Sequence, residues 1–251
     1  MHMSQWTRRA EFWLGVRDTA PLVVGAVPFG IIFGAVAVSG GVVAEGEIAR
    51  QLSPLAVQSM SLFVYAGASQ FIAAELVRNS AAVLVVIFTT LIVNLRHALY
   101  SASLAAYLHN FPQRWLLPLG FTLTDETFVV AIRRYQQADA SPYKHWYQAG
   151  SAVLMYTSWQ LCTLIGILAG RSIPPEQVAR LGLGFAATVT FIGMLIPLIH
   201  SRALFISVIA AGAASVVFHR LPNYLGLLAA ALVGIAAGLL TERAETRAAY
   251  G

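Results

Sequence analysis

Residues Ala81 to His109 read AAVLVVIFTTLIVNLRHALYSASLAAYLH, and this stretch decides the class of fold. It is longer than the roughly 20 apolar residues that a helix needs to cross a bilayer. Its middle nevertheless carries Asn94, Arg96 and His97. An arginine near the bilayer centre costs about 2.5–3.5 kcal/mol on insertion scales, so it occurs there only where protein groups, water or a substrate compensate its charge. Arg96 is therefore the first candidate functional residue.

The composition of the whole chain indicates a membrane protein built from helices. Of its 251 residues, 58% are hydrophobic and 11% are charged, whereas soluble domains have about 25% charged residues. Apolar runs of roughly 18 to 28 residues follow one another, and the ten-residue alternation of barrel strands is absent. We therefore expect an all-α polytopic bundle of about seven or eight transmembrane helices, with broken helices near the midplane. No linker divides the chain, so residues 1–251 form a single domain in this interpretation.

Hydropathy places eight spans along the chain. They run over about 20–44, 54–77, 80–108, 113–132, 147–170, 182–200, 203–218 and 224–241. The segment 80–108 is long enough for two short helices that break near Asn94, and 203–218 is short, so counts from seven to nine stay open. Lys and Arg gather in the loops on the side of both termini, which the positive-inside rule places in the cytoplasm.

Several kinds of chemistry are disfavoured by what the sequence lacks. Cys162 is the only cysteine, which excludes an internal disulfide and a cysteine-rich metal site. No nucleotide-binding P-loop is present, so we expect neither ATP hydrolysis nor a cofactor. The net charge of +5 fits basic loops that face anionic lipid better than it fits the binding of nucleic acid.

The first expected span contains VPFGIIFG at residues 27–34. Pro28 in this motif is followed by Gly30 and Gly34 and preceded by Gly25. Proline removes a backbone donor and crowds the preceding turn, so we expect a kink or a break between about Gly25 and Gly30. Two interpretations stay open. Either the freed backbone groups hold a substrate, as in many transporters, or the proline makes an ordinary kink and the glycines form a close-packing face.

The second expected span carries SMSLFVYAGASQFIAAEL, with Tyr65, Ser69 and Gln70 near its middle. Small and polar residues on a transmembrane helix usually mark contact with another helix, but lipid cannot satisfy the amide of Gln70. The tripeptide GAS at 67–69 also has a superficial similarity to the turn of a serine nucleophile, for which His97 or His200 would be the base. The fuller glycine pattern of such hydrolases is absent, so an intramembrane hydrolase is the weaker alternative.

The central stretch and the fourth span supply charges that can compensate each other. The planar guanidinium of Arg96 suits a carboxylate, and His97 titrates near neutral pH and can relay a proton. In the motif LTDETF, Asp125 and Glu126 follow Thr124 close to the centre of the fourth span. Adjacent residues point about 100° apart on a helix, so one carboxylate can pair with Arg96 while the other meets a substrate ammonium, a proton or a partner. A purely structural ion pair of Arg96 is the equal alternative.

The last two expectations concern the remainder of the chain. Trp159, like other aromatic residues of the fifth span, is assigned to interfacial and packing positions. Beyond about residue 182 no charge lies well inside a span, so we interpret 182–241 as scaffold helices or as a partner surface.

Four motifs, in this order and spacing, carry a resemblance to a known family. They are VPFGIIFG, SLFVYAGASQF, VNLRHALYSASL and LTDETF, and together they resemble the AzlC family, the large subunit of the branched-chain amino acid exporters. The similarity covers residues 17–170, the motif-bearing part of the chain. It implies a secondary exporter of leucine, isoleucine and valine in a bacterial inner membrane, not an enzyme, with proton coupling and a small hydrophobic partner subunit of the AzlD type.

The resemblance also suggests roles for the residues singled out above. A zwitterion with an aliphatic side chain needs a cation or a helix N-terminus for its carboxylate, an acid or backbone carbonyls for its ammonium, and an apolar recess. The expected substrate-binding residues are Phe29, Gly30, Tyr65, Ser69, Gln70, Phe71, Asn94, Arg96 and Thr124, and those expected for proton coupling or ion pairing are Asp125, Glu126 and His97. Another small neutral amino acid or organic molecule is the alternative substrate.

Overall fold

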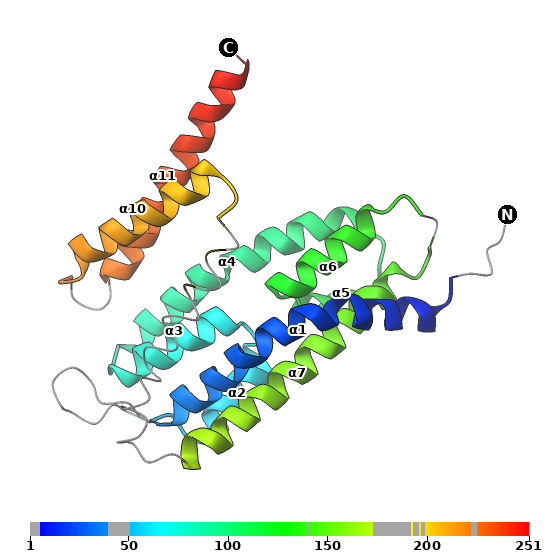
Figure 1. The fold of residues 1–251 in the computed structure, drawn as a ribbon, viewed down its shortest axis with the longest axis horizontal. Helices are drawn as coiled ribbons and strands as arrows, with labels where there is room; N and C mark the ends of the chain where they lie inside the picture. Colours follow the sequence, from blue (N-terminus) through cyan, green and yellow to red (C-terminus); the bar gives the residue numbers. More distant parts are fainter. Residues whose placement is uncertain are drawn as a thin grey trace.

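The computed structural model describes residues 6–39, 51–139, 141–172, 192, 196, 199–221 and 225–250. These residues form helices and loops without strands, which confirms the expected all-α class. In chain order the helices are α1 (Arg8–Ser39), α2 (Pro54–Phe63), α3 (Gly67–Arg78), α4 (Val83–Leu108), α5 (Gln113–Phe121), α6 (Asp125–Gln136), α7 (Lys144–Ser172), α10 (Arg202–Phe218) and α11 (Leu225–Tyr250) (Figure 1). Among the described residues, α1, α4 and α7 are long and apolar enough to cross a membrane. Most of the expected span at 182–200 lies outside the described residues.

Two of the expected spans are broken helices. The second span divides into α2 and α3 at residues 64–66, and the fourth divides into α5 and α6 at residues 122–124. The breaks considered at Pro28 and near Asn94 are wrong, because α1 and α4 are helical through both residues. Broken helices are thus present, but in different spans from those in which the sequence suggested them.

Local chemistry explains where the helices stop and start. Tyr65 adopts a φ of 48°, in the left-handed region, where a helix of L-residues cannot continue. Thr124 is the N-cap of α6, and it exchanges hydrogen bonds between side chain and amide with Thr127 to form a capping box. In α1, Pro28 removes one backbone hydrogen bond, but α1 packs against α7 over much of its length and stays helical.

The helices α1 and α7 approach so closely that their backbones touch, and they lie alongside each other in Figure 1. We call this contact the α1–α7 seam, and the glycines that meet the backbone of the other helix there are Gly15, Gly34, Gly150, Gly166 and Gly170. A Cβ atom added to Gly34 would lie 2.2 Å from the carbonyl oxygen of Thr163, and one added to Gly166 would lie 2.1 Å from that of Ile31. Small residues permit such an approach between helices in membranes. The close-packing interpretation of Gly34 is therefore confirmed.

The C-terminal helices α10 and α11 pack on each other and stand apart from α1–α7 in Figure 1. The hydroxyl of Ser207 in α10 donates to the carbonyl oxygen of Gly234 in α11 at 2.7 Å. Gly234 has no side chain, and a Cβ atom there would lie 2.8 Å from that of Ala211. The scaffold role of this region stays a prediction.

Five residues hold the start of α1 against the loop between α6 and α7, and we call them the clasp. The side chain of Arg134, only 2% exposed, donates to both carboxylate oxygens of Glu11 and also to Asp139. Ser141 donates to Glu11 at 2.6 Å, and Lys144 pairs with Asp139 at 3.1 Å. Burial raises the pKa of Asp139, but hydrogen bonds from Arg134 and Lys144 outweigh this effect and hold that pKa below its ordinary value. The clasp therefore joins the first helix to the sixth and seventh.

Replacement of Gly166 by alanine tests the α1–α7 seam. The added methyl group would meet backbone atoms, which cannot move aside as a side chain can, so we expect Gly166→Ala to lower the free energy of unfolding by about 1–3 kcal/mol. The measurement is thermal unfolding of the purified protein in detergent. Gly212→Ala is the matched control, since nothing lies within 4 Å of its added Cβ atom. Equal stability of the two variants would show that the seam is not tight.

Removal of one partner tests the clasp. Arg134→Ala leaves the buried carboxylate of Glu11 without its counter-charge, so we expect a loss of about 3–5 kcal/mol in the free energy of unfolding. Arg133→Ala, which removes an exposed neighbour, should change stability by less than about 0.5 kcal/mol. Urea unfolding in mild detergent compares the two. A similar small change for both variants would argue against a clasp.

Candidate functional site

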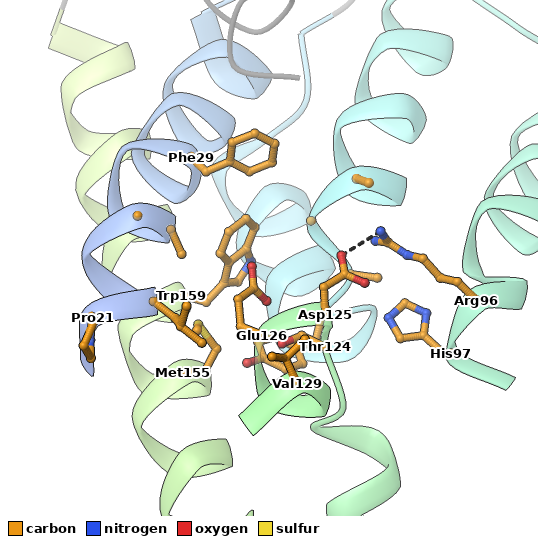
Figure 2. A pocket seen from close by; sticks show the side chains of 17 residues that line it. Pro21, Phe29, Arg96, His97, Thr124, Asp125, Glu126, Val129, Met155 and Trp159 are labelled. Carbon is orange, nitrogen blue, oxygen red and sulfur yellow. Dashed lines mark hydrogen bonds and ion pairs between the residues drawn. The ribbon is translucent and has the colours of Figure 1, made fainter. Parts of the chain in front are cut away.

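A cavity of about 470 Å³ lies between α1, α3, α4, α6 and α7 (Figure 2). Its volume falls within the range of about 300–1,000 Å³ that is usual for sites of small molecules. Its walls are formed by Pro21, Leu22, Gly25, Ala26, Phe29, Tyr65, Ala66, Gly67, Ala68, Arg96, His97, Thr124, Asp125, Glu126, Val129, Met155 and Trp159. Both broken spans contribute to it, because residues 65–68 and 124–126 lie at the starts of α3 and α6.

An ion pair occupies one side of the cavity. Nη1 of Arg96 lies 2.7 Å from Oδ2 of Asp125, and the hydroxyl of Tyr100 donates to Oδ1 of the same carboxylate at 2.6 Å. The side chains of Arg96 and Asp125 are 29% and 32% exposed, so the pair is partly shielded from solvent. Both oxygens of Asp125 are thus occupied, and the charge of Arg96 is compensated within the protein.

The neighbouring acid, Glu126, lies on the side of Asp125 away from Arg96 (Figure 2). Within the described part of the chain, no hydrogen bond or ion pair reaches its carboxylate. Both acids stand in the first turn of α6, where the positive end of the helix dipole favours negative charge. Glu126 is therefore the carboxylate of this site that is free to meet a cation.

The other helix start has unpaired donors. Ala66 is the N-cap of α3 and offers no side-chain acceptor to its first amides. Tyr65, just before it, is 3% exposed, and its hydroxyl has no hydrogen-bond partner among the described residues. Gly67 sits under the ring of Trp159, where a Cβ atom would lie 2.9 Å from the nearest ring carbon. Donors at the start of α3 therefore border the cavity without acceptors in the described part of the chain.

The apolar wall of the cavity is organised around Trp159. Its ring lies 6.3 Å from that of Phe29 between centroids, and Met155 lines the cavity one turn earlier on α7. The indole nitrogen of Trp159 donates to Oε1 of Gln70 at 3.2 Å, and Nε2 of Gln70 donates to Ser61 at 2.9 Å. The buried Gln70 thereby fixes the orientation of the tryptophan from behind the wall.

The structure brings together seven of the residues expected at the site. The residues on the cavity wall are Phe29, Tyr65, Arg96, His97, Thr124, Asp125 and Glu126. The ring of His97 contacts the carbonyl oxygen of Asn94 through Nδ1 at 3.2 Å and meets the ring of Tyr100 edge to face. All of the acidic and basic candidates therefore converge on one place.

Five expected residues do not line the cavity. They are Gly30, Ser69, Gln70, Phe71 and Asn94. Gly30 faces Cys162 on α7, and Phe71 packs against Phe29 with ring centroids 4.8 Å apart. Gly30, Gln70 and Phe71 thus support the wall from outside, and direct contact of any of the five residues with a substrate stays a prediction.

The geometry gives no support to a serine nucleophile. Ser69 is fully buried and donates to the carbonyl oxygen of Ala66 at 2.9 Å. The hydrogen bond of His97 goes to Asn94, so the described residues contain no Ser69–His97 hydrogen bond of the kind that activates a nucleophile.

Several wall residues were missed from the sequence, Trp159 and Met155 foremost. Trp159 was assigned to interfacial or packing positions, yet it lies near the middle of α7 (Lys144–Ser172) and on the cavity. Interfacial tryptophans lie at the ends of spans, so its central position was a usable signal. Met155 and Val129 carry no such signal, because apolar residues are ordinary in a span.

The structure is an apolar bundle in which two broken helices border a cavity lined by ionisable residues. This arrangement is typical of membrane transport proteins. The chain belongs to the AzlC family, since the family described as AzlC protein matches residues 21–173. It is thus a membrane protein of a family associated with branched-chain amino acid transport.

Three relatives show how far the similarity extends. An uncharacterized membrane protein of Archaeoglobus fulgidus is 30% identical over 92% of this chain and 96% of its own length. The inner membrane protein YgaZ of Escherichia coli is 28% identical over 92% of this chain and 89% of its own length. The branched-chain amino acid transport protein AzlC of Bacillus subtilis is 26% identical over 75% of this chain and 70% of its own length. No solved structure matches the chain.

A double-mutant cycle tests the ion pair. We expect Arg96→Gln and Asp125→Asn each to lower the melting temperature, because each leaves one charge uncompensated, and the double variant to recover part of that loss. Since both side chains are about a third exposed, the coupling should be about 1 kcal/mol. Thermal unfolding in detergent measures it. Strictly additive effects of the two substitutions would rule out a stabilising pair.

Proposed function

We propose that this chain is a secondary transporter that exports branched-chain amino acids across a bacterial inner membrane. The observation that carries the proposal is Glu126, a carboxylate without a protein partner among the described residues, which shares a cavity with an apolar wall. Such a cavity can take a molecule that combines a cation with an aliphatic group. The printed name of the Bacillus subtilis relative supports branched-chain amino acids as that molecule.

In this proposal the two parts of the substrate have separate receptors. Glu126 accepts hydrogen bonds from the ammonium group, since charge-assisted bonds are the strong ones in a partly dry site. Phe29, Met155 and Trp159 enclose the aliphatic side chain. Ordinary dispersion and the exclusion of water stabilise that contact. A different small neutral amino acid is the alternative, because a cavity of about 470 Å³ does not by its size select leucine.

Coupling to protons belongs to the same proposal. Besides Tyr65 and Arg96, the ionisable groups on the cavity wall are His97, Asp125 and Glu126, and these three are the candidates for proton coupling. Asp125 is held by Arg96 and Tyr100, whereas Glu126 is open, so Glu126 is the group that a proton and a substrate ammonium would compete for. Exchange of the two on one carboxylate would link export to the proton gradient.

A small hydrophobic subunit of the AzlD type, and a cytoplasmic N-terminus, complete the proposal. α4 offers a face for such a subunit, because Leu91, Leu95 and Leu99 are exposed on it. Lipid covers an apolar face equally well, so the support for a partner comes from the family resemblance.

Counterflow of radiolabelled leucine in liposomes tests the function. We expect leucine movement that responds to an imposed pH gradient, with the small subunit present, and a loss of about tenfold or more in Glu126→Gln, which removes the charged acceptor. Glu75→Gln is the matched control, since Glu75 lies at the end of α3 and is 61% exposed. Unchanged transport by Glu126→Gln would remove the proposed role of this acid. Absence of any leucine movement would contradict the substrate itself.

A further inference from the structure

We propose that the start of α3, together with the hydroxyl of Tyr65, is a carboxylate-binding subsite, and that Arg96 is not the receptor for the carboxylate of the substrate. The assignment rests on the proposed function and deepens it, because it names the group that one wall of the cavity recognises. The ligand class that follows is an α-amino acid with a free carboxylate.

The first observation is a set of unpaired amides at the cavity. The first backbone hydrogen bond of α3 runs from Gln70 to Ala66 at 2.9 Å, so the amides of residues 67–69 precede the helical ladder. Within the described residues no acceptor reaches them, and the N-cap contributes no side chain. Residues 67 and 68 line the cavity. Amides at a helix start, backed by the helix dipole, attract anions.

The second observation is the side chain of Tyr65. Only 3% of Tyr65 is exposed, and the residue lines the same cavity. Its hydroxyl donates to no described residue. Its backbone is held at a φ of 48°, a conformation that is costly for a bulky residue and persists where the surrounding structure enforces it. A residue with a buried and unpaired hydroxyl thus lines the same cavity as the free amides of Gly67 and Ala68. In this proposal both kinds of donor serve one carboxylate.

The third observation removes the obvious competitor. Arg96 already bonds to Asp125, and Asp125 is held on its other oxygen by Tyr100. Only Nη1 of Arg96 makes this bond, and its Nε has no partner among the described residues, but a substrate carboxylate at Arg96 would stand beside the like charge of Asp125. A carboxylate at the start of α3 would instead meet backbone donors that no described acidic side chain has taken. The Arg96–Asp125 pair therefore shapes the wall without receiving the carboxylate.

The arrangement also suits a zwitterion. The ammonium and the carboxylate of an α-amino acid are attached to one carbon atom, so their receptors must lie close together. Tyr65, Gly67 and Glu126 all border one cavity, and they supply donors for one group and an acceptor for the other. Gly67 allows the ring of Trp159 to pack closely on the start of α3, since a Cβ atom there would lie 2.9 Å from that ring.

Isothermal titration of the purified protein, with its small subunit where one is required, tests the subsite. The probes are leucine, leucinamide, methionine and alanine at about pH 6.5, where the amine of leucinamide stays protonated. In the unaltered protein we expect leucinamide to bind at least about tenfold more weakly than leucine. Tyr65→Phe should weaken leucine about tenfold and leave leucinamide unchanged. Tyr156→Phe is the matched control, because its ring packs on Tyr65 but does not line the cavity.

Arg96→Gln decides between the two candidate receptors without altering the break before α3. We expect the preference for leucine over leucinamide to survive this substitution. A preference that disappears in Arg96→Gln, or equal binding of leucine and leucinamide by the unaltered protein, would overturn the subsite.

The remaining outcomes separate the subsite from the proposed function. Leucine binding that does not depend on its carboxylate overturns the subsite and leaves the exporter proposal standing. Binding of methionine or alanine that Tyr65→Phe weakens, without binding of leucine, supports the subsite and overturns the branched-chain substrate. Binding of none of the four probes overturns both.

Discussion

A backbone amide inside a membrane must find an acceptor, because hydrocarbon offers none. This constraint governs both broken spans of the protein. At the start of α6 it is met internally, by the capping box of Thr124 and Thr127. At the start of α3 it is not, because Ala66 has no side chain that can accept. Both starts border one cavity, so an arrangement that lipid would not tolerate is stable where a polar molecule or water can reach it.

Two adjacent acids at the start of α6 illustrate how position divides chemical roles. Asp125 and Glu126 share the same helix end and the same dipole, but about 100° of helical rotation separates their directions. The carboxylate of Asp125 points toward Arg96 and Tyr100, which donate one hydrogen bond to each of its oxygens. The other acid, Glu126, borders the cavity. Of these two neighbouring acids, Asp125 therefore stabilises the structure in an ion pair, whereas Glu126 is available to a cation in the cavity.

Features that leave a signal within a short stretch of sequence could be predicted, whereas features that depend on contacts between distant parts of the chain could not. Arg96 and the acids of α6 stand out because charges are rare in apolar runs. The start of α6 also has a sequence signal, since a threonine followed by two acids is typical of a helix N-terminus, whereas the expected break was placed at Pro28 because proline disrupts helices more strongly. Packing against α7 overrides Pro28. The clasp joins Glu11 to Arg134 across 123 positions, and no spacing rule reaches that far.

The α1–α7 seam carries a mechanical consequence. Helices whose backbones touch at Gly34 and Gly166 have no space in which to slide or tilt against each other. Phe29 of α1 and Trp159 of α7 thus belong to one rigid wall of the cavity. The remaining walls of the cavity lie on α3, α4 and α6, and the clasp ties α6 to α1. In the proposed transport function, rocking that exposes the cavity first to one face of the membrane and then to the other would therefore fall on α3 and α4, with α1, α7 and the clasped α6 as the stationary frame.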